Sequence, residues 1–182
     1  MIDVTTPSHA AIDHIEALFE RQGAAFYGEE PISQLQHALQ CALLAEQAHE
    51  KPAQIVAALL HDVGHLLIEE SMSEDRRHQE VAMPYLAHLG EAVTEPIRLH
   101  VAAKRYLCVI DDTYFDSLSP ASQRTLMLQG GVFDAEEATR FSSQPWAGEA
   151  VRLRQYDDLA KVQGLVTPDF AYFRQYFERV SA

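Results

Sequence analysis

One short apolar segment carries the residues with the clearest chemical potential. Residues 54–67 read QIVAALLHDVGHLL and contain three ionisable side chains, His61, Asp62 and His65. In a helix, His61 and His65 share a face because they are four residues apart, and Asp62 is turned about a third of the way round from His61. An unpaired buried charge costs several kcal/mol, and a bound metal ion is the simplest compensation. The segment therefore predicts a metal site on a helix.

Further His and Asp residues on other segments strengthen this hypothesis. A His-Asp pair alone is weak evidence, because with nine His residues in 182 such pairs also arise by chance. Each single His could be a satisfied core residue, and Asp157 could lie with Asp158 on a solvated face. Four His and two Asp residues exceed one closed tetrahedral zinc site and suit two cations bridged by a carboxylate, most naturally that of Asp62. The predicted metal ligands are His37, His61, Asp62, His78, His100 and Asp157.

The elements that must position these ligands are helices. Apolar residues recur at helical spacing along almost the whole chain, and strand alternation is scarce. We therefore expect an all-α bundle forming a single domain over residues 1–182, with a polar loop at 69–77 over the site. One helix should run from Ser119-Pro120 to Gly130-Gly131. The others are predicted at 7–23, 31–49, 54–67, 78–89, 95–109 (capped by Thr94), 134–141, 147–163 and 168–180.

Composition limits the possible partners. The net charge of −13 argues against nucleic acid and against anionic membrane surfaces, although local Lys and metal charge can still bind an anionic substrate. Cys41 and Cys108 form no disulfide framework and are expected to be reduced core thiols. No signal peptide and no long apolar run is recognisable, so a cytoplasmic protein is expected, as a monomer or a homo-oligomer.

The order His, His-Asp, His, His, Asp resembles the HD-domain superfamily, whose members carry these ligands on a helical bundle and are mostly metal-dependent phosphohydrolases. A narrower resemblance rests on HVAAKRYL at 100–107, QGG at 129–131 and LRQYD at 153–157, together with YGEE at 27–30 and QLQH at 34–37. With these segments the chain resembles the mixed-valence di-iron oxygenases that cleave organophosphonates (the PhnZ and TmpB group). The matching region runs from about residue 27 to residue 161.

The resemblance implies a di-iron centre and names its ligands. One iron would be held by His37, His61, Asp62 and Asp157, and the second by Asp62, His78 and His100, with Asp62 as the bridging ligand of the catalytic centre. Asp157 is preferred to Asp158 because an aromatic residue, here Tyr156, precedes the ligand in the family. Substrate contacts are implied for Tyr27, Glu30, His65, Lys104, Ser122 and Gln129.

The spacing of Lys104 from His100 indicates a role for this lysine independently of the resemblance. It follows His100 by one helical turn, so an ammonium and a metal ligand share a face, and this arrangement could hold a phosphonate. The alternative is a surface lysine whose stem lies along the helix.

The implied reaction is oxidative cleavage of a carbon–phosphorus bond, with an Fe(II)/Fe(III) pair and O2 as co-substrate. The substrate would be a 1-hydroxyethylphosphonate with an amino or trimethylammonium group at C2, giving phosphate and glycine or glycine betaine. We favour the trimethylammonium, because quaternary cations bind aromatic faces and diffuse negative charge. The residues that could provide these are Tyr27, Tyr106, Tyr114, Phe115, Glu30, Asp111 and Asp112. The alternatives are an HD-type metal-dependent phosphohydrolase and a signalling or scaffold module with a degenerate site.

Overall fold

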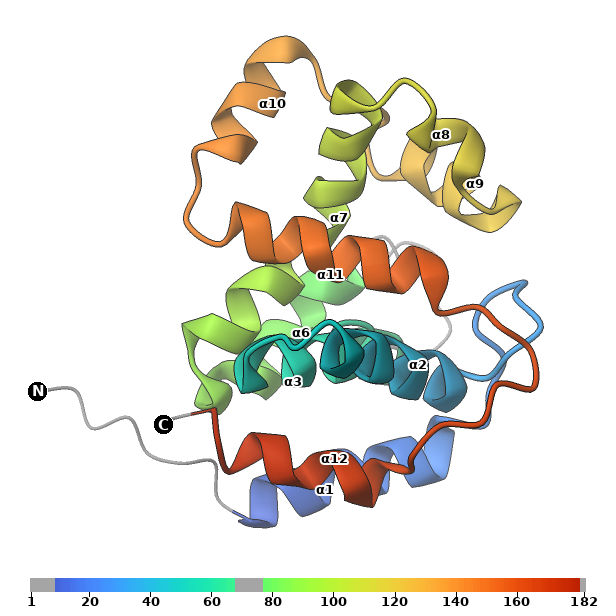
Figure 1. The fold of residues 1–182 in the computed structure, drawn as a ribbon, viewed down its shortest axis with the longest axis vertical. Helices are drawn as coiled ribbons and strands as arrows, with labels where there is room; N and C mark the ends of the chain where they lie inside the picture. Colours follow the sequence, from blue (N-terminus) through green and yellow to red (C-terminus); the bar gives the residue numbers. More distant parts are fainter. Residues whose placement is uncertain (1–8, 68–76, 181–182) are drawn as a thin grey trace, which may run out of the picture.

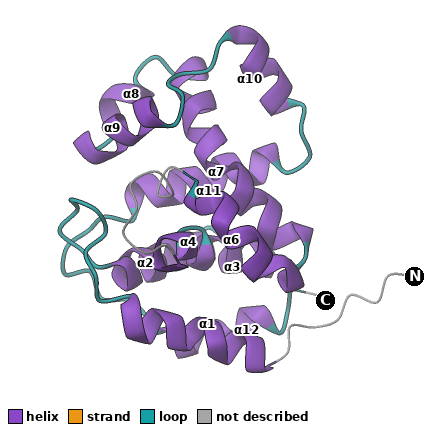
Figure 2. Cartoon of the chain, turned by 180° about the vertical axis from the view of Figure 1, so that it is seen from behind, coloured by secondary structure: helices purple, strands orange, loops and turns teal. Residues whose placement is uncertain are grey.

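The computed structural model describes residues 9–67 and 77–180, and in these ranges the chain is built from helices (Figure 2). The described part has no strand beyond an isolated bridge between Phe26 and Ser33. The predicted all-α fold is therefore confirmed. The predicted loop at 69–77 lies outside the described residues except for Arg77. Among the described helices, none has the length and hydropathy that a membrane crossing needs.

The helices keep close to the predicted order along the chain. Their bounds are α1 His9–Gln22, α2 Gln34–Gln47, α3 Pro52–Leu60, α4 Val63–Leu67, α6 His78–Leu86, the 3-10 helix η1 Ala87–Leu89, α7 Glu91–Ile110, α8 Tyr114–Ser117, α9 Pro120–Leu128, α10 Ala135–Ser142, α11 Ala147–Leu159 and α12 Phe170–Phe177.

Side-chain caps fix the start of the helices that carry site residues. At the start of α2, the Ser33 side chain accepts a hydrogen bond from the Gln36 amide, and the Gln36 side chain accepts one from the Ser33 amide. This reciprocal capping box satisfies two backbone donors at the start of the helix. It thereby fixes the first turn of α2, directly before His37. At the start of α9, Ser119 caps the helix and Pro120 occupies the first turn, as predicted.

The predicted continuous helix at 54–67 is wrong at its centre. The segment divides into α3 and α4, with His61 and Asp62 in the turn between them. His61 Nδ1 lies 2.9 Å from the carbonyl of Ala58, which would accept from the Asp62 amide in an uninterrupted helix. The His65 amide then donates to the Asp62 carbonyl, three residues back. The metal-site residues thus interrupt the helix that carries them.

Other helix boundaries also differ from prediction, most of all the start of α7 and the end of α11, each by four residues. Thr94 does not cap the α7 helix, because Gly90, with φ of 81°, provides the break and α7 begins at Glu91. The Thr94 hydroxyl instead donates to the Gly90 carbonyl within the first turn. The helix predicted at 147–163 ends at Leu159. The short helix α8 was not predicted.

The site-bearing helices occupy the middle of the molecule (Figure 1). Helices α2, α3, α6 and α11 lie between a layer of α1 and α12 at one end and α8, α9 and α10 at the other, and α7 runs from this middle region into the second group. The largest apolar cluster joins α1, α2, α3 and α12 through buried residues such as Ile15, Leu59 and Phe173. A second cluster joins α7, α10 and α11, and a third joins α7, α8 and α9. Burial of these clusters holds the central helices at fixed separations.

We predict that Gly64→Ala lowers stability and disturbs the site. A Cβ at Gly64 would lie 2.0 Å from the carbonyl oxygen of His78, so α4 and the start of α6 approach more closely than any larger residue allows. Overpacking of this kind typically costs about 1–3 kcal/mol. Denaturant unfolding and metal content should both report the loss, since His78 must shift.

Gly148→Ala is the matched control. It also lies in a helix, is exposed, and its Cβ would meet only the Arg152 side chain, at 3.7 Å. Replacing this glycine should be neutral or stabilise by up to about 1 kcal/mol. Equal stability of the two variants would show that the close approach of α4 and α6 is not a constraint.

Candidate metal centre

The structure brings the six predicted metal ligands together at one buried point. They come from α2, the turn after α3, the start of α6, α7 and α11, and each is no more than 8% exposed. The two oxygens of Asp62 face different histidines. Oδ1 lies 3.1 Å from His78 Nε2 and 3.6 Å from His100 Nε2, whereas Oδ2 lies 3.3 Å from His61 Nε2 and 3.6 Å from His37 Nε2. This is the geometry expected of a bridging carboxylate between two cations.

Backbone carbonyls orient three of the imidazoles. Nδ1 lies 2.9 Å from the Ala160 carbonyl in His37, 2.9 Å from the Ala58 carbonyl in His61 and 2.7 Å from the Ile97 carbonyl in His100. A carbonyl only accepts, so each Nδ1 carries the proton and each Nε2 lone pair points inward. Metal-binding histidines are typically held in this way.

The donor set fits a pair of cations. His37 Nε2 and His61 Nε2 are 3.3 Å apart, and His78 Nε2 and His100 Nε2 are 3.2 Å apart. Lone pairs that face each other at such distances need a proton or a cation between them. Asp62 Oδ2 is buried and accepts no hydrogen bond in the described part of the chain. A metal ion in each half of the cluster would satisfy both requirements.

Charge in the cluster is distributed unevenly between the histidines. Burial lowers the pKa of His37 to about 4. Burial also lowers the pKa of His61, but the carboxylate of Asp62 outweighs it and raises that pKa to about 9. The centre therefore favours positive charge beside Asp62 even with protein groups alone.

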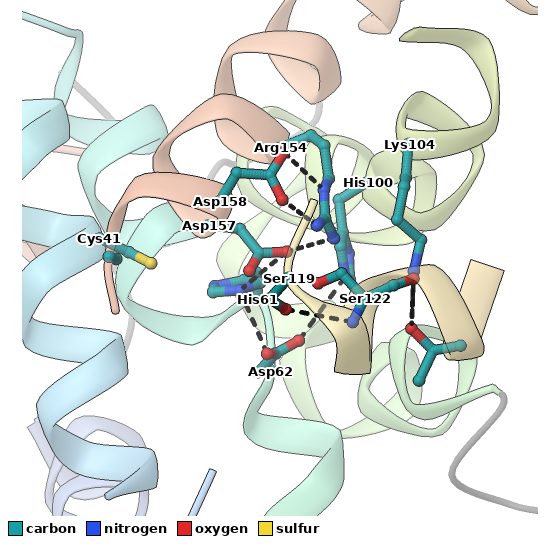
Figure 3. A network of polar contacts seen from close by, with 12 residues as sticks. Cys41, His61, Asp62, His100, Lys104, Ser119, Ser122, Arg154, Asp157 and Asp158 are labelled. Atoms are coloured by element: carbon teal, nitrogen blue, oxygen red, sulfur yellow. Dashed lines mark hydrogen bonds and ion pairs between the residues drawn. The ribbon is translucent and has the colours of Figure 1, made fainter. Parts of the chain in front are cut away.

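Arg154 orients the carboxylate of Asp157, the candidate metal ligand on α11 (Figure 3). Its Nη1 donates to Asp157 Oδ2 at 2.5 Å, while Asp157 Oδ1 faces His37 Nε2 at 3.5 Å. Asp158 is turned away from the histidines, since it pairs with Arg154 and accepts from the Tyr114 hydroxyl at 2.5 Å. This arrangement supports the choice of Asp157 over Asp158. Arg154 was not predicted, although it lies three residues before Asp157.

A cavity of about 180 Å³ opens beside the cluster, and all six predicted substrate contacts line it. Tyr27 stacks on His37, with ring centroids 3.8 Å apart, and its hydroxyl donates to Asp157 Oδ1 at 3.3 Å. His65 stacks on His78. The cavity is smaller than typical drug-binding pockets and suits a ligand of few heavy atoms. Further lining residues that were not predicted include Thr125, Arg154 and Lys161.

Lys104 is a buried cation in the wall of this cavity. It is 2% exposed, so the surface-lysine alternative is wrong, and its Nζ donates to Thr125 Oγ1 at 2.9 Å. Burial and then the nearby Arg154 lower its pKa to about 7. An anion that binds in the cavity would stabilise the charged form of this buried lysine.

Most residues proposed for a trimethylammonium lie elsewhere. Tyr106 packs on Phe141, and the Tyr114 hydroxyl is bonded to Asp158. Phe115 is 37% exposed, and neither it nor the two carboxylates at 111 and 112 lines the cavity. Of the seven proposed residues, Tyr27 and Glu30 line the cavity and the other five do not, so among the described residues the proposed aromatic subsite is reduced to Tyr27.

Cys41 lies closer to the centre than the sequence indicated. Its sulfur is 3.7 Å from His37 Nε2, and the side chain is fully buried. Burial raises the pKa of this thiol, which keeps it protonated. Cys41 is four residues after His37 on α2, and this spacing was the available signal.

A helical bundle with convergent His and Asp side chains defines a metal-dependent protein of the HD class. The chain matches the HD domain over residues 35–111. It is 46% identical to hydroxymethylphosphonate dioxygenase of Gimesia maris, over 93% of this chain and 89% of that relative. It is 39% identical to the glycine-betaine-forming [1-hydroxy-2-(trimethylamino)ethyl]phosphonate dioxygenase of Leisingera caerulea, with the same coverage. The chain therefore belongs to the HD-domain phosphonate dioxygenases, enzymes that use a metal and O2.

We predict that metal stabilises the fold. Titration of metal-free protein with Fe(II) under anaerobic conditions should saturate at about two ions per chain. Chelation should lower the melting temperature by about 5–10 °C, because binding at a hundredfold excess over Kd contributes about 2.7 kcal/mol. Saturation at one ion, or an unchanged melting temperature, would contradict the two-cation interpretation.

We predict that Lys104→Met stabilises the metal-free protein at low pH. The folded-state pKa of about 7 lies below that of an unfolded lysine, so burial of the ammonium costs stability fully below pH 7. The cost disappears as the pH rises towards about 10.4. The variant should gain roughly 2–4 kcal/mol at pH 6 and little at pH 10, by denaturant unfolding. The exposed Lys51→Met control should show no such pH dependence.

Proposed function

We propose that this protein is a di-iron oxygenase that cleaves the carbon–phosphorus bond of a 1-hydroxyphosphonate. The observation that carries the proposal is the position of Asp62, whose two oxygens face separate histidine pairs beside a cavity with a buried ammonium. The two named relatives act on different phosphonates, and both names specify a hydroxyl on the carbon bonded to phosphorus. A 1-hydroxyphosphonate is the substrate class that they share.

We assign the two metal sites as the family resemblance implies them. His37, His61, Asp62 and Asp157 would hold one iron, and Asp62, His78 and His100 the other. His and carboxylate ligands without thiolate suit iron that reacts with oxygen. In its Fe(II)/Fe(III) state the pair supplies the activation of O2 and of the substrate hydroxyl.

The protein residues bind and orient the substrate. Lys104 is placed to pair with the phosphonate, and the Ser122 hydroxyl and the Gln129 amide line the same cavity. Gln129 Oε1 is buried without a hydrogen-bond partner in the described residues, so a donor is still needed there. Tyr27 stacks on His37 and His65 stacks on His78 in the wall of the cavity, so each ring covers one face of a candidate metal ligand and limits the access of water to it.

The proposed reaction balances without an external reductant. The carbon–hydrogen and carbon–phosphorus bonds of the substrate supply four electrons, which is the number that O2 accepts. For hydroxymethylphosphonate the products are formate and phosphate, and longer substrates give the corresponding carboxylate. We further propose that residues 1–182 form one domain. The cytoplasmic location, the oligomeric state and the absence of a nucleic-acid partner stay predictions.

Iron-loaded protein should release phosphate from at least one 1-hydroxyphosphonate, with one O2 consumed per phosphate. The panel is hydroxymethylphosphonate, 2-amino-1-hydroxyethylphosphonate and its trimethylammonium analogue. His100→Ala should lose one iron and lower kcat at least about a hundredfold, because a ligand to one metal is removed. His88→Ala, at an exposed position outside the cavity, is the matched control and should keep both irons.

The alternative hypothesis, a metal-dependent hydrolase, predicts the opposite results. A metal-dependent phosphohydrolase would work without O2, would accept zinc or manganese, and would act on phosphate esters. Anaerobic release of phosphate by zinc-loaded protein would therefore contradict the oxygenase proposal.

A further inference from the structure

Lys161 is a second lysine of the cavity, and no role has yet been assigned to it. It follows the end of α11, four residues after Asp157, and its side chain is 13% exposed. Its Nζ donates to Ser122 Oγ at 3.1 Å and lies 3.7 Å from Glu30 Oε1. It therefore contacts two of the residues predicted to bind substrate.

The backbone around Lys161 is firmly held. The buried side chain of Gln40 donates to the Val162 carbonyl at 2.8 Å and accepts from the Val162 amide at 3.0 Å. On the other side, the Ala160 carbonyl accepts from His37 Nδ1. Because Ala160 and Val162 are both held in place, the Lys161 side chain is directed into the cavity. One of these contacts, that of the Ala160 carbonyl, also orients the candidate metal ligand His37.

The charges around the cavity are already paired, with one exception. Asp157 is paired with Arg154, and Asp62 lies among the histidines. Glu30, whose side chain is 15% exposed, is paired with Lys161. Lys104 has no carboxylate within ion-pair distance in the described part of the chain. The cavity therefore offers an unpaired cation to a ligand, and no unpaired carboxylate.

We propose that Lys161 determines substrate specificity by occupying Glu30, so that the cavity selects a hydroxyphosphonate without a cationic group. Hydroxymethylphosphonate is the simplest such substrate. This inference rests on the proposed function and narrows its substrate class.

Electrostatics disfavours an aminated substrate. A substrate ammonium beside Glu30 would have to displace Lys161 or lie near two like charges, Lys104 and Lys161, in a largely buried cavity. A trimethylammonium also needs aromatic faces, and Tyr27 is the one Phe, Tyr or Trp among the described lining residues, with one face stacked on His37.

Glu30 Oε1 also permits a competing interpretation. It is buried and accepts no hydrogen bond in the described residues, so it could await a donor from an aminated substrate. In that case Lys161 would move aside on binding, and the wild-type protein would prefer the amine.

The test compares kcat/KM for hydroxymethylphosphonate and 2-amino-1-hydroxyethylphosphonate in iron-loaded wild-type protein and in Lys161→Met. The wild type should prefer hydroxymethylphosphonate at least about tenfold. Lys161→Met leaves Glu30 unpaired and should shift the ratio at least about tenfold towards the amine. Lys51→Met removes an exposed lysine and should leave the ratio unchanged.

The double variant Glu30→Gln, Lys161→Met separates charge from structure. It removes both charges, so its substrate ratio should return to within about threefold of wild type if the ion pair sets the preference. A double variant as amine-tolerant as Lys161→Met would overturn the proposal. Anaerobic calorimetry with both phosphonates should show the same ranking in Kd, independent of turnover.

The outcomes distinguish this inference from the proposed function. Wild-type preference for either aminated substrate overturns the role of Lys161 and leaves the oxygenase assignment intact. Absence of O2-dependent phosphate release from every substrate overturns the oxygenase assignment. If Lys161→Met fails to fold, the wild-type ratio and the calorimetric ranking still decide.

Discussion

The structure depends on one shared carboxylate. The two oxygens of Asp62 face two histidine pairs that come from α2, the turn after α3, α6 and α7. A single side chain cannot adjust to one pair without leaving the other. The helices must therefore pack at nearly fixed separations, and the inward lone pairs would repel without positive charge between them. We therefore expect metal binding to be coupled to folding, as in other proteins whose ligands come from separate elements.

Local interactions of the chain serve this constraint. The turn at His61 and Asp62 interrupts an apolar helix so that two adjacent residues can serve both halves of the cluster. Gly64 lets the start of α6 approach α4, which brings His78 over Asp62. Arg154 and the Ala160 carbonyl act in the same way on Asp157 and His37, since each fixes one end of a side chain whose other end faces the centre.

The sequence predicted the fold class and the candidate ligands because few residue types bind metals and helical spacing fixes their faces. It did not predict Arg154 or Lys161 as site residues, because a long polar side chain in sequence looks the same whether it faces solvent or a cavity. Tyr114 shows the reverse error, since an aromatic residue suits core packing as well as cation binding. The break after Leu60 was missed because a side chain in the turn bonds to a helix carbonyl, which periodicity cannot show.

Charge pairing in the cavity also explains how so acidic a chain can bind an anion. A net charge of −13 repels a phosphonate at long range, so binding must rely on positive charge within the site. A lysine already paired with a carboxylate would attract a phosphonate only weakly. An unpaired buried ammonium lowers the stability of the protein, and a bound anion removes this cost. Lys104 has this unpaired character, and Lys161 does not. The two lysines therefore have different tasks: one attracts the phosphonate, and the other neutralises the carboxylate that would otherwise attract a cation.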